Sequence, residues 1–481
     1  MRARRAALYL APMLRRQSGR GGPGVGRAPS LLFVNKYYAP DVAATGQILG
    51  DLAEHLAARG YSVSVLASRE GYAAARRDGR ASEDRNGVAV SRVGGTAFGR
   101  GRHAGRIADY AAYYVRALVR VLAGPRYDGV VFLTTPPLLG VVGWLGRVLR
   151  GQRYGVWSMD LHPEAEVAAG MLRPGSAVVR LLRGLNALAY RGADFVVDLG
   201  PYMRRRIADA GAPPERAHTV HVWSTGDAVV PIEPAANPLV RELGLAGRFV
   251  VMYSGNAGMV HEFGPVLEAM RILRDDPRAY FLFVGDGPQR ARIEAFAREH
   301  ALPNFAYRDY FPREALHQSL SLAGAHLVTL RDAFVGIAVP SKVYGAMAAA
   351  RPVLFVGPAA SEPAEAVTGA GCGVVVAGGG ADAGERLAAE IRALMADEAR
   401  CRALGAAGRA AFLRHYDRRP NCEAFEAVIA GAWGAPPEAA AGRPAARRPT
   451  STARNPGSPQ PITKTLKPCF MRSSMSLAVA G

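Results

Sequence analysis

Short apolar runs alternate with segments of helical periodicity through the first half of the chain. Residues 47–59 repeat apolar positions at helical spacing, between apolar runs at residues 31–34 and 62–67. Further apolar runs lie at residues 130–133, 154–159 and 195–198. Short continuous apolar strands that alternate with helices are typical of a parallel sheet covered on both faces. The pattern therefore predicts an α/β domain over residues 30–226.

The alternation begins again after residues 225–238, a segment with three prolines that is predicted to link two domains. Strands are predicted at residues 249–253, 280–284, 305–307, 326–330, 353–356 and 373–376, and helices at 266–273, 289–300, 383–396 and 399–416. Ligands of open α/β sheets bind at the carboxyl ends of the strands. We therefore predict two doubly wound, Rossmann-like domains, residues 30–226 and 227–433, that face a cleft.

The two ends of the chain are predicted to be disordered, because residues 1–29 and 434–481 lack any periodicity. They also carry most of the net charge of +20, with +7 in residues 1–30 and +6 in residues 434–481. Between them, residues 31–230 carry +8 and residues 231–433 carry −1. A basic half beside a neutral half fits contact with an anionic membrane surface better than a nucleic-acid partner.

Cysteine usage and apolar runs limit the class of protein further. Four cysteines, Cys372, Cys401, Cys422 and Cys469, show no metal-ligand spacing, so neither a metal nor another cofactor is predicted. A reducing cytoplasm is the expected compartment. Apolar runs at residues 6–14 and 130–149 are interrupted by proline, and neither is predicted to be a signal peptide or a membrane span.

Residues 339–353 contain the clearest candidate chemistry. Ser341 and Lys342 stand at the start of a predicted helix, just before the apolar run at residues 353–356. A helix N-terminus offers unpaired N–H groups that suit a phosphate, Ser341 is a good N-cap, and Lys342 adds a positive charge. An ordinary connection between strand and helix explains these residues equally well.

Glycines follow several predicted strands. Gly46 precedes the first helix, Gly255 and Gly258 lie in the loop after the strand at 249–253, and Gly285-Asp286-Gly287-Pro288 follows the next strand. Glycine lets a ligand approach backbone N–H groups closely. Tight turning is the more common reason for glycine in such loops.

Asp160 and His162 follow the strand at 154–159, where they could contact a substrate hydroxyl or accept its proton. The alternative is that Asp160 caps a turn and His162 packs beside it. His261 and Glu262 are predicted only to begin a helix. No GxGxxG follows the first strand and no GxxxxGK[ST] occurs, which argues against a dehydrogenase or a P-loop nucleotidase. Strand-end loops also lack an Asp-x-Asp motif. If a nucleotide diphosphate is the leaving group, protein cations must therefore stabilise it, and Arg331 and Lys342 are the candidates.

In this order, the motifs resemble family 4 glycosyltransferases of the GT-B fold. The resemblance is closest to bacterial amino-sugar or deoxysugar transferases that build O-antigen and colanic-acid polysaccharides. The matching segments are residues 33–40 with Gly46, 159–164, 253–263, 283–288 and 339–353.

The resemblance implies transfer of a sugar, with retained configuration, from a UDP- or GDP-linked donor to a polyprenyl-linked or saccharide acceptor. It implies a donor on the second half, with Gly255 and Asn256 near the phosphates and Arg331 and Lys342 neutralising them. Residues 285–288 would border the nucleoside, and Tyr310 would lie beside the base. The leaving phosphate would help to deprotonate the acceptor. The place of action would be the inner face of the plasma membrane, and amphipathic segments at residues 100–120 and 178–185 could contact it.

The sequence departs from the family pattern at one pair of positions. The wider family has two glutamates eight residues apart, where this chain has Ile337 and Gly345. The family's usual Arg and Lys are also absent near residues 258–262. Glu362 is a candidate for a contact with the donor ribose, although it could equally be a surface carboxylate. The identity of the donor sugar stays open.

Two alternative functions remain. A nucleotide-sugar 2-epimerase of the same architecture would need carboxylates and histidines that converge on the sugar, and the sequence offers no matching set. A nucleic-acid-binding module would depend on the basic ends of the chain.

Overall fold

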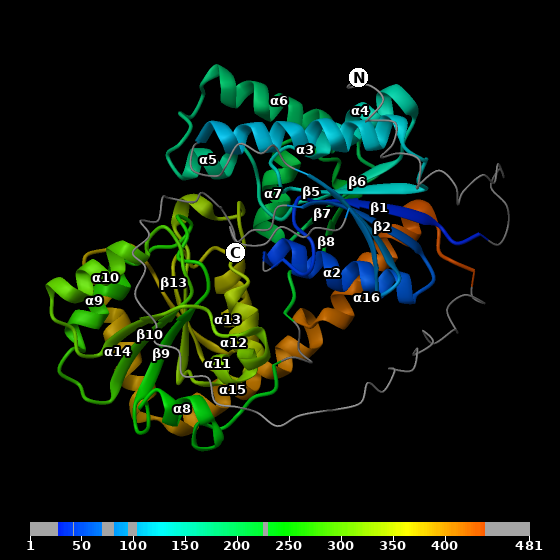
Figure 1. Ribbon diagram of the computed structural model, residues 1–481. Helices are drawn as coiled ribbons and strands as arrows, with labels where there is room; N and C mark the ends of the chain where they lie inside the picture. The colour runs from blue at the N-terminus through cyan, green and yellow to red at the C-terminus, as the bar shows by residue number, and fades with distance from the viewer. Residues whose placement is uncertain (1–26, 42, 70–80, 95–102, 225–228, 438–481) are drawn as a thin grey trace, which may run out of the picture.

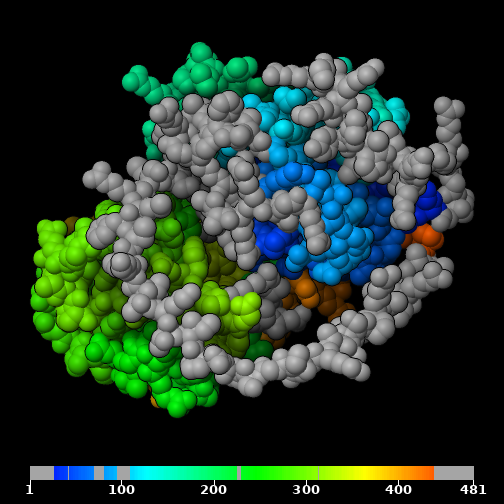
Figure 2. Space-filling view, viewed as in Figure 1, coloured from blue at the N-terminus to red at the C-terminus, as the bar shows by residue number. Residues whose placement is uncertain are grey.

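The computed structural model describes residues 27–41, 43–69, 81–94, 103–224 and 229–437. Figure 1 shows two halves, each built around a sheet with helices on its faces. The space-filling view places the blue and cyan atoms of the first half beside the green atoms of the second (Figure 2). This arrangement confirms the prediction of two Rossmann-like α/β units with parallel sheets.

The first sheet has the strand order β3-β4-β2-β1-β5-β6-β7-β8. The strands are β1 (Ser30–Val34), β2 (Ser62–Ser68), β3 (Ser82–Arg85), β4 (Val88–Val93), β5 (Gly129–Leu133), β6 (Tyr154–Trp157), β7 (Phe195–Asp198) and β8 (Ala217–Thr219). All neighbours are parallel except β3 and β4. The helices of this half are α2 (Ala44–Ala58), α3 (His103–Ala123), α4 (Gly140–Arg150), α5 (Glu164–Ala168), α6 (Ala177–Gly192) and α7 (Pro201–Asp209).

The second sheet is parallel throughout and has the order β11-β10-β9-β12-β13-β14. Its strands are β9 (Phe249–Ser254), β10 (Ala279–Val284), β11 (Phe305–Arg308), β12 (Ala325–Thr329), β13 (Val353–Val356) and β14 (Gly373–Val376). The α-helices are α8 (Pro238–Glu242), α9 (Gly264–Ile272), α10 (Arg290–Glu299), α11 (Leu316–Ser321), α12 (Lys342–Ala348), α13 (Glu362–Ala370), α14 (Ala383–Ala396), α15 (Glu398–Ala411) and α16 (Arg418–Trp433).

The strands form where the sequence has continuous apolar runs, because helices cover both faces of each sheet. Every residue of β5, β6, β7, β12 and β13 is buried. Edge strand β3 has the sequence SEDR, which is polar and gave no signal in the hydrophobic pattern. The first helix begins at Ala44, so Gly46 lies in its first turn and the prediction that Gly46 precedes the helix is wrong.

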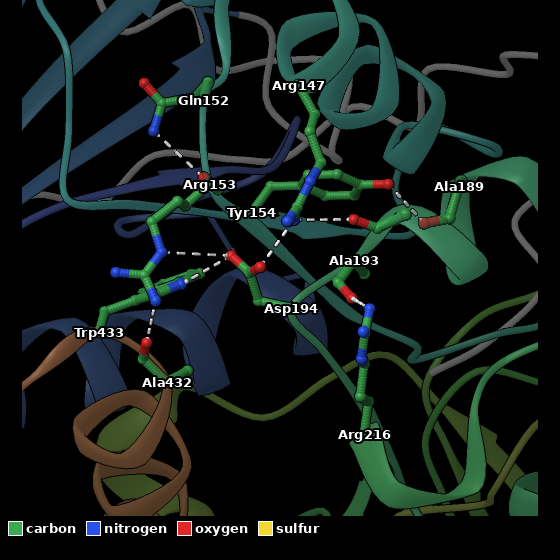
Figure 3. A network of polar contacts seen from close by, with 11 residues as sticks. Arg147, Gln152, Arg153, Tyr154, Ala189, Ala193, Asp194, Arg216, Ala432 and Trp433 are labelled. Atoms are coloured by element: carbon green, nitrogen blue, oxygen red, sulfur yellow. Dashed lines mark hydrogen bonds and ion pairs between the residues drawn. The ribbon is translucent and has the colours of Figure 1, made fainter.

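The last described helix, α16, returns from the second half and packs against the first. Its Trp433 donates a hydrogen bond from Nε1 to Asp194 Oδ2 (3.0 Å), and Arg147 and Arg153 hold the same carboxylate (Figure 3). The Trp433 and Phe195 ring centroids are 4.9 Å apart. The sequence predicted that the second domain extends to residue 433, whereas these contacts fasten residues 418–433 to the first half.

A second contact between the halves surrounds the N-terminal turns of α7. The Glu362 carboxylate, at the start of α13, accepts a hydrogen bond from the Met203 N–H (2.8 Å). The Tyr202 hydroxyl donates to Glu365 (2.7 Å), and the Arg206 guanidinium donates to the Val335 carbonyl (2.6 Å). Helix α7 is therefore held by groups from two separate segments of the second half.

No helix within the described ranges is long and apolar enough to cross a membrane. Most of the residues predicted to be disordered, 1–26 and 438–481, lie outside the described ranges.

Candidate active site

The Lys342 side chain lies between the carboxyl ends of β9 and β12. Lys342 is the first residue of α12. Its Nζ is 3.1 Å from His261 Nε2 and 5.4 Å from the centre of the Tyr253 ring. The aliphatic part of the side chain crosses Gly255, where an added Cβ would be 2.5 Å from Lys342 Cε. One segment, residues 253–261, therefore surrounds an ammonium group that lies about eighty residues further along the chain.

Burial in this enclosure lowers the pKa of Lys342 to about 7, although part of the side chain remains accessible. Removing water from a cation favours its neutral form, and a nearby anion reverses that preference. An anionic ligand beside Nζ would therefore be bound together with a proton at neutral pH.

His261 is a candidate site residue that the sequence interpretation assigned only to the start of a helix. It lies in the loop between β9 and α9, before the helix begins at Gly264, so it does not begin that helix. The imidazole is 2% exposed, and its Nδ1 is 2.8 Å from the Thr329 carbonyl oxygen. Burial and the charge of Lys342 hold the pKa of His261 well below its usual value. Its position after a glycine-rich loop was visible, but its partner is 81 residues further along the chain.

Two glycine-rich loops pack directly on each other at this edge of the sheet. The Gly255 N–H donates to the Val284 carbonyl (2.8 Å), and the Ala257 N–H donates to the Asp286 carbonyl (2.7 Å). Gly255, Gly285 and Gly287 have φ values of +132°, +134° and +137°, which disfavour any residue with a Cβ. A Cβ at Gly285 would meet the Gly255 backbone and lie 3.3 Å from the Tyr310 ring.

These contacts bring most of the predicted donor-site residues together. Asn256 faces Gly287, and its carbonyl accepts a hydrogen bond from the Tyr253 hydroxyl (2.7 Å). Tyr310 is 57% exposed beside Gly285, and Asp286 is also exposed. Ser341 is adjacent to Lys342 and occupies the N-cap position of α12, as predicted, although its side chain makes no capping hydrogen bond.

Arg331 lies at the end of β12 but points to a different surface. Its guanidinium donates to the Met259 carbonyl (3.1 Å) and lies 5.7 Å from the Phe334 ring. It lines a cavity of 510 Å³ together with Glu262, Asp332 and the loop after β14 (378–381). Arg331 and Lys342 therefore lie on two different sides of the β9–α9 loop.

Asp160 and His162 form the facing cluster in the first half. Asp160 is 3% exposed, and burial raises the pKa of its carboxyl to about 7. The His162 Nδ1 is 2.7 Å from a Glu166 oxygen. Burial alone would lower the pKa of His162, but the hydrogen bond and charge of Glu166 raise it. The cluster thus holds one carboxyl group close to neutrality beside an imidazole that favours its charged form.

The loop that carries Asp160 touches the second half directly. Asp160 pairs with Ala338 as an isolated antiparallel bridge, and the Leu161 N–H donates to the Ile337 carbonyl (3.0 Å). Ala338 lies four residues before Lys342 in the chain. Backbone contacts between the halves therefore connect the Asp160 cluster to the segment that leads into α12.

The structure gives Gly46 and Glu362, which were predicted to bind the donor, contacts within the protein. A Cβ at Gly46 would be 3.1 Å from the backbone of Tyr37 and Tyr38, so Gly46 permits close packing of the loop after β1. Glu362 is 5% exposed and faces the N-terminal turn of α7, and burial raises the pKa of its carboxyl. In this structure its contacts are with the first half.

No group of three or more His, Cys, Asp or Glu side chains suited to a metal ion occurs among the residues that the structure describes.

A fold of two facing Rossmann-like domains occurs among glycosyltransferases, and comparison with known families agrees with that class. The model of the glycosyl transferase 4-like domain matches residues 44–223, and that of the glycosyl transferases group 1 matches residues 240–411. The chain belongs to the family 4 glycosyltransferases of the GT-B fold.

Its relatives include proteins of bacterial polysaccharide synthesis. A probable glycosyltransferase, WbjE of Pseudomonas aeruginosa, is 29% identical over 48% of this chain and 58% of its own length. The putative colanic acid biosynthesis glycosyl transferase WcaI of Escherichia coli K12 is 26% identical over 65% of this chain and 79% of its own length. The match to WbjE therefore spans little more than half of that protein.

The fold is also similar to that of solved structures. HepE of Anabaena, solved in complex with UDP and glucose, has a TM-score of 0.63 and 15% sequence identity over 84% of this chain and 100% of its own. At this identity the likeness concerns the fold.

Proposed function

We propose that this protein is a retaining glycosyltransferase that moves a sugar from a nucleotide-sugar to a lipid-linked or saccharide acceptor in cell-surface polysaccharide synthesis. The observation that carries the proposal is the Lys342 ammonium, enclosed beside two interlocked glycine-rich loops in a chain of this family. The domain that ends near residue 226 would take the acceptor, and residues 227–417 would take the donor.

The donor would lie along the carboxyl edge of the second sheet. Its phosphates would approach Gly255, Asn256 and Ser341, with Lys342 beside them. The loop at residues 285–287 and the exposed Tyr310 ring would border the nucleoside. Structures of the neighbour HepE contain UDP or UDP-glucose, which supports a nucleotide-sugar with a similar diphosphate. Arg331 would supply a second positive charge, and Glu362 would reach a ribose only if its contact with α7 opens.

The proposed chemistry depends on charge stabilisation at the leaving group. A fixed ammonium beside the departing diphosphate stabilises charge that develops in the transition state. The chain supplies this charge itself, which favours a reaction independent of divalent ions. The departing phosphate would accept the acceptor's proton, and Asp160 and His162 would bind the hydroxyl groups of the reacting sugar.

We also propose that the first half docks on an anionic membrane surface. Val115 and Val119 of α3, Val148 and Leu149 of α4, and Val178 and Leu181 of α6 are 50–65% exposed. Helices α4 and α6 together contain five arginines and no acidic residue. Figure 1 shows α3, α4 and α6 along one outer edge of the first half. Interfacial binding combines such apolar area with attraction to anionic lipid.

The test of the activity uses UDP- and GDP-linked sugars with short saccharide or polyprenyl-diphosphate acceptors. Sugar transfer to the acceptor, with the anomeric configuration of the product determined by NMR, supports the proposal, and persistence of transfer in EDTA supports independence of metal ions. An epimerised nucleotide-sugar formed without any acceptor would instead favour an epimerase.

Membrane docking is tested separately by sedimentation with vesicles. Vesicles that contain phosphatidylglycerol should retain the protein, and neutral phosphatidylcholine vesicles should not. The double change Leu149→Glu with Leu181→Glu should release it without loss of transfer to a soluble saccharide acceptor. Equal sedimentation of both proteins would remove the α3–α4–α6 face from the proposal.

A further inference from the structure

The neighbours of the His261 imidazole determine which of its ring nitrogens carries a hydrogen. Its Nδ1 faces two oxygen atoms of Thr329, the carbonyl at 2.8 Å and the hydroxyl at 3.2 Å. A carbonyl oxygen only accepts hydrogen bonds, so Nδ1 must carry the hydrogen. Thr329 is fully buried at the end of β12, which leaves this contact no room to rearrange.

The other ring nitrogen then has a lone pair. His261 Nε2 is 3.1 Å from Lys342 Nζ, a group that donates hydrogen bonds. A doubly protonated imidazole would instead direct an N–H group at the ammonium. While Lys342 is charged, this geometry fits only a neutral imidazole that accepts from it, and the depressed pKa of His261 agrees.

Further contacts keep the imidazole in place. The Gln289 side-chain amide donates to the carbonyls of Gly258 (2.7 Å) and His261 (3.0 Å). The His261 ring packs edge-on against Tyr253, with centroids 5.5 Å apart. Two titratable groups beside the ammonium are His261 from the β9–α9 loop and Tyr253 from β9.

We propose that His261 is a positioning residue, which holds the Lys342 ammonium toward the donor diphosphate through a tautomer set by Thr329. This inference rests on the proposed donor site. A neutral acceptor holds the ammonium without cancelling its charge, whereas a carboxylate at the same point would compete with the diphosphate. The contact with His261 therefore leaves the charge of Lys342 uncancelled.

The role predicts a specific pH dependence. Donor binding needs the charged form of Lys342, so affinity should fall as the pH rises above the pKa of the ammonium. Loss of the acceptor at His261 removes a contact that favours the charged form, so this fall should begin at a lower pH. A hydrogen bond to a charged group contributes enough to move the midpoint by roughly one pH unit.

Two substitutions separate the positioning role from a structural one. His261→Gln can place its amide oxygen near the position of Nε2 and so retain an acceptor for Lys342. His261→Asn can place its amide nitrogen near the position of Nδ1 and so retain the donor to Thr329, but it reaches Lys342 less well. Both side chains are neutral and polar, and thermal unfolding of each variant checks that it is folded.

The measurement is calorimetric titration of the full-length protein with UDP and with GDP between pH 6 and pH 9, the range that brackets the Lys342 pKa of about 7. His261→Asn should weaken nucleotide binding above pH 7 by about ten-fold or more, and it should lower the pH at which affinity has fallen by half. His261→Gln should leave that pH at the value of the unaltered protein. Identical midpoints in all three proteins, or a shift in His261→Gln alone, would overturn the inference. Failure of the unaltered protein to bind either nucleotide would instead count against the proposed function.

Discussion

The two facing strand ends contain buried ionisable groups of opposite sign. Lys342 in the second half and Asp160 in the first both have a pKa that burial moves to about 7, downward for the amine and upward for the carboxyl. Their neighbours differ. Lys342 contacts a neutral histidine, whereas Asp160 lies beside His162, which Glu166 biases toward its charged form. The comparison teaches that burial can bring an amine and a carboxyl to a similar pKa beside very different histidines, one held neutral by a lysine and one held charged by a glutamate.

Removing the amine should have the largest effect. Lys342→Ala should lower kcat/KM for the nucleotide-sugar by about 10²–10³-fold, because an electrostatic contact with a departing group contributes about 2.7–4 kcal/mol. Steady-state kinetics with the donor varied measures the change. Arg331→Ala is the matched control, because it also removes a cation but one whose guanidinium donates to the Met259 carbonyl. It should lower kcat/KM less than Lys342→Ala does. Equal losses in both variants would remove the distinction between the two cations.

The burial of the Asp160 carboxyl is tested through the pH dependence of the free energy of unfolding. The pKa of Asp160 in the folded protein, about 7, lies above its usual value of 3.8. The neutral carboxyl therefore contributes fully to the stability of the fold below about pH 4, and this contribution is lost as the pH rises through 7. Asp160→Asn does not titrate. Its free energy of unfolding should therefore rise relative to that of the unaltered protein between pH 4 and pH 8, by up to on the order of 4 kcal/mol. Urea unfolding at several pH values gives the difference, and a pH-independent difference would contradict the burial argument.

A methyl group beside the amine should have an intermediate effect. Gly255→Ala puts a Cβ 2.5 Å from Lys342 Cε at a backbone φ of +132°, so both strain and displacement are expected, with a loss of about 1–3 kcal/mol in transition-state stabilisation. Gly345→Ala, in the same helix as Lys342, is the control, because its Cβ would only reach ordinary contact with Leu320 at 3.7 Å. The ratio of kcat/KM between the two variants isolates the effect on the amine.

The smallest effect is expected where the halves touch. Glu362→Gln keeps the shape of the side chain but weakens its hydrogen bond to the Met203 N–H, at a cost of about 1 kcal/mol in unfolding free energy. Donor KM should change little if this carboxylate only joins the halves. A large rise in KM with unchanged stability would show instead that Glu362 contacts the donor.

The sheets were predictable because their strands are covered on both faces. Continuous apolar runs such as β5 and β13 can hardly form anything except buried strands. Strand β3 was missed because an edge strand of four polar residues has neither the alternation nor the apolarity of a buried strand.

The residues around the site were predictable one at a time but not as contacts. The loop glycines and Lys342 stood out because their chemistry is local. The link from His261 to Lys342 joins residues 81 positions apart, and the hydrogen bond from Met203 to Glu362 spans 159. Local periodicity carries no information about such pairs, just as the amphipathic pattern of α16 does not reveal which half it covers.

The return of α16 makes the chain pass between the halves twice, and the two passages run side by side. Ser224 pairs with Asp417 in a parallel bridge, and the Ser224 N–H donates to the Tyr416 carbonyl (3.4 Å). The halves could rotate about these two tethers only if their other contacts, at α7 and at the Asp160–Ala338 bridge, also open. Such a rotation would change the spacing of the facing strand ends, so the position of Asp160 relative to Lys342 would depend on a place that neither residue touches.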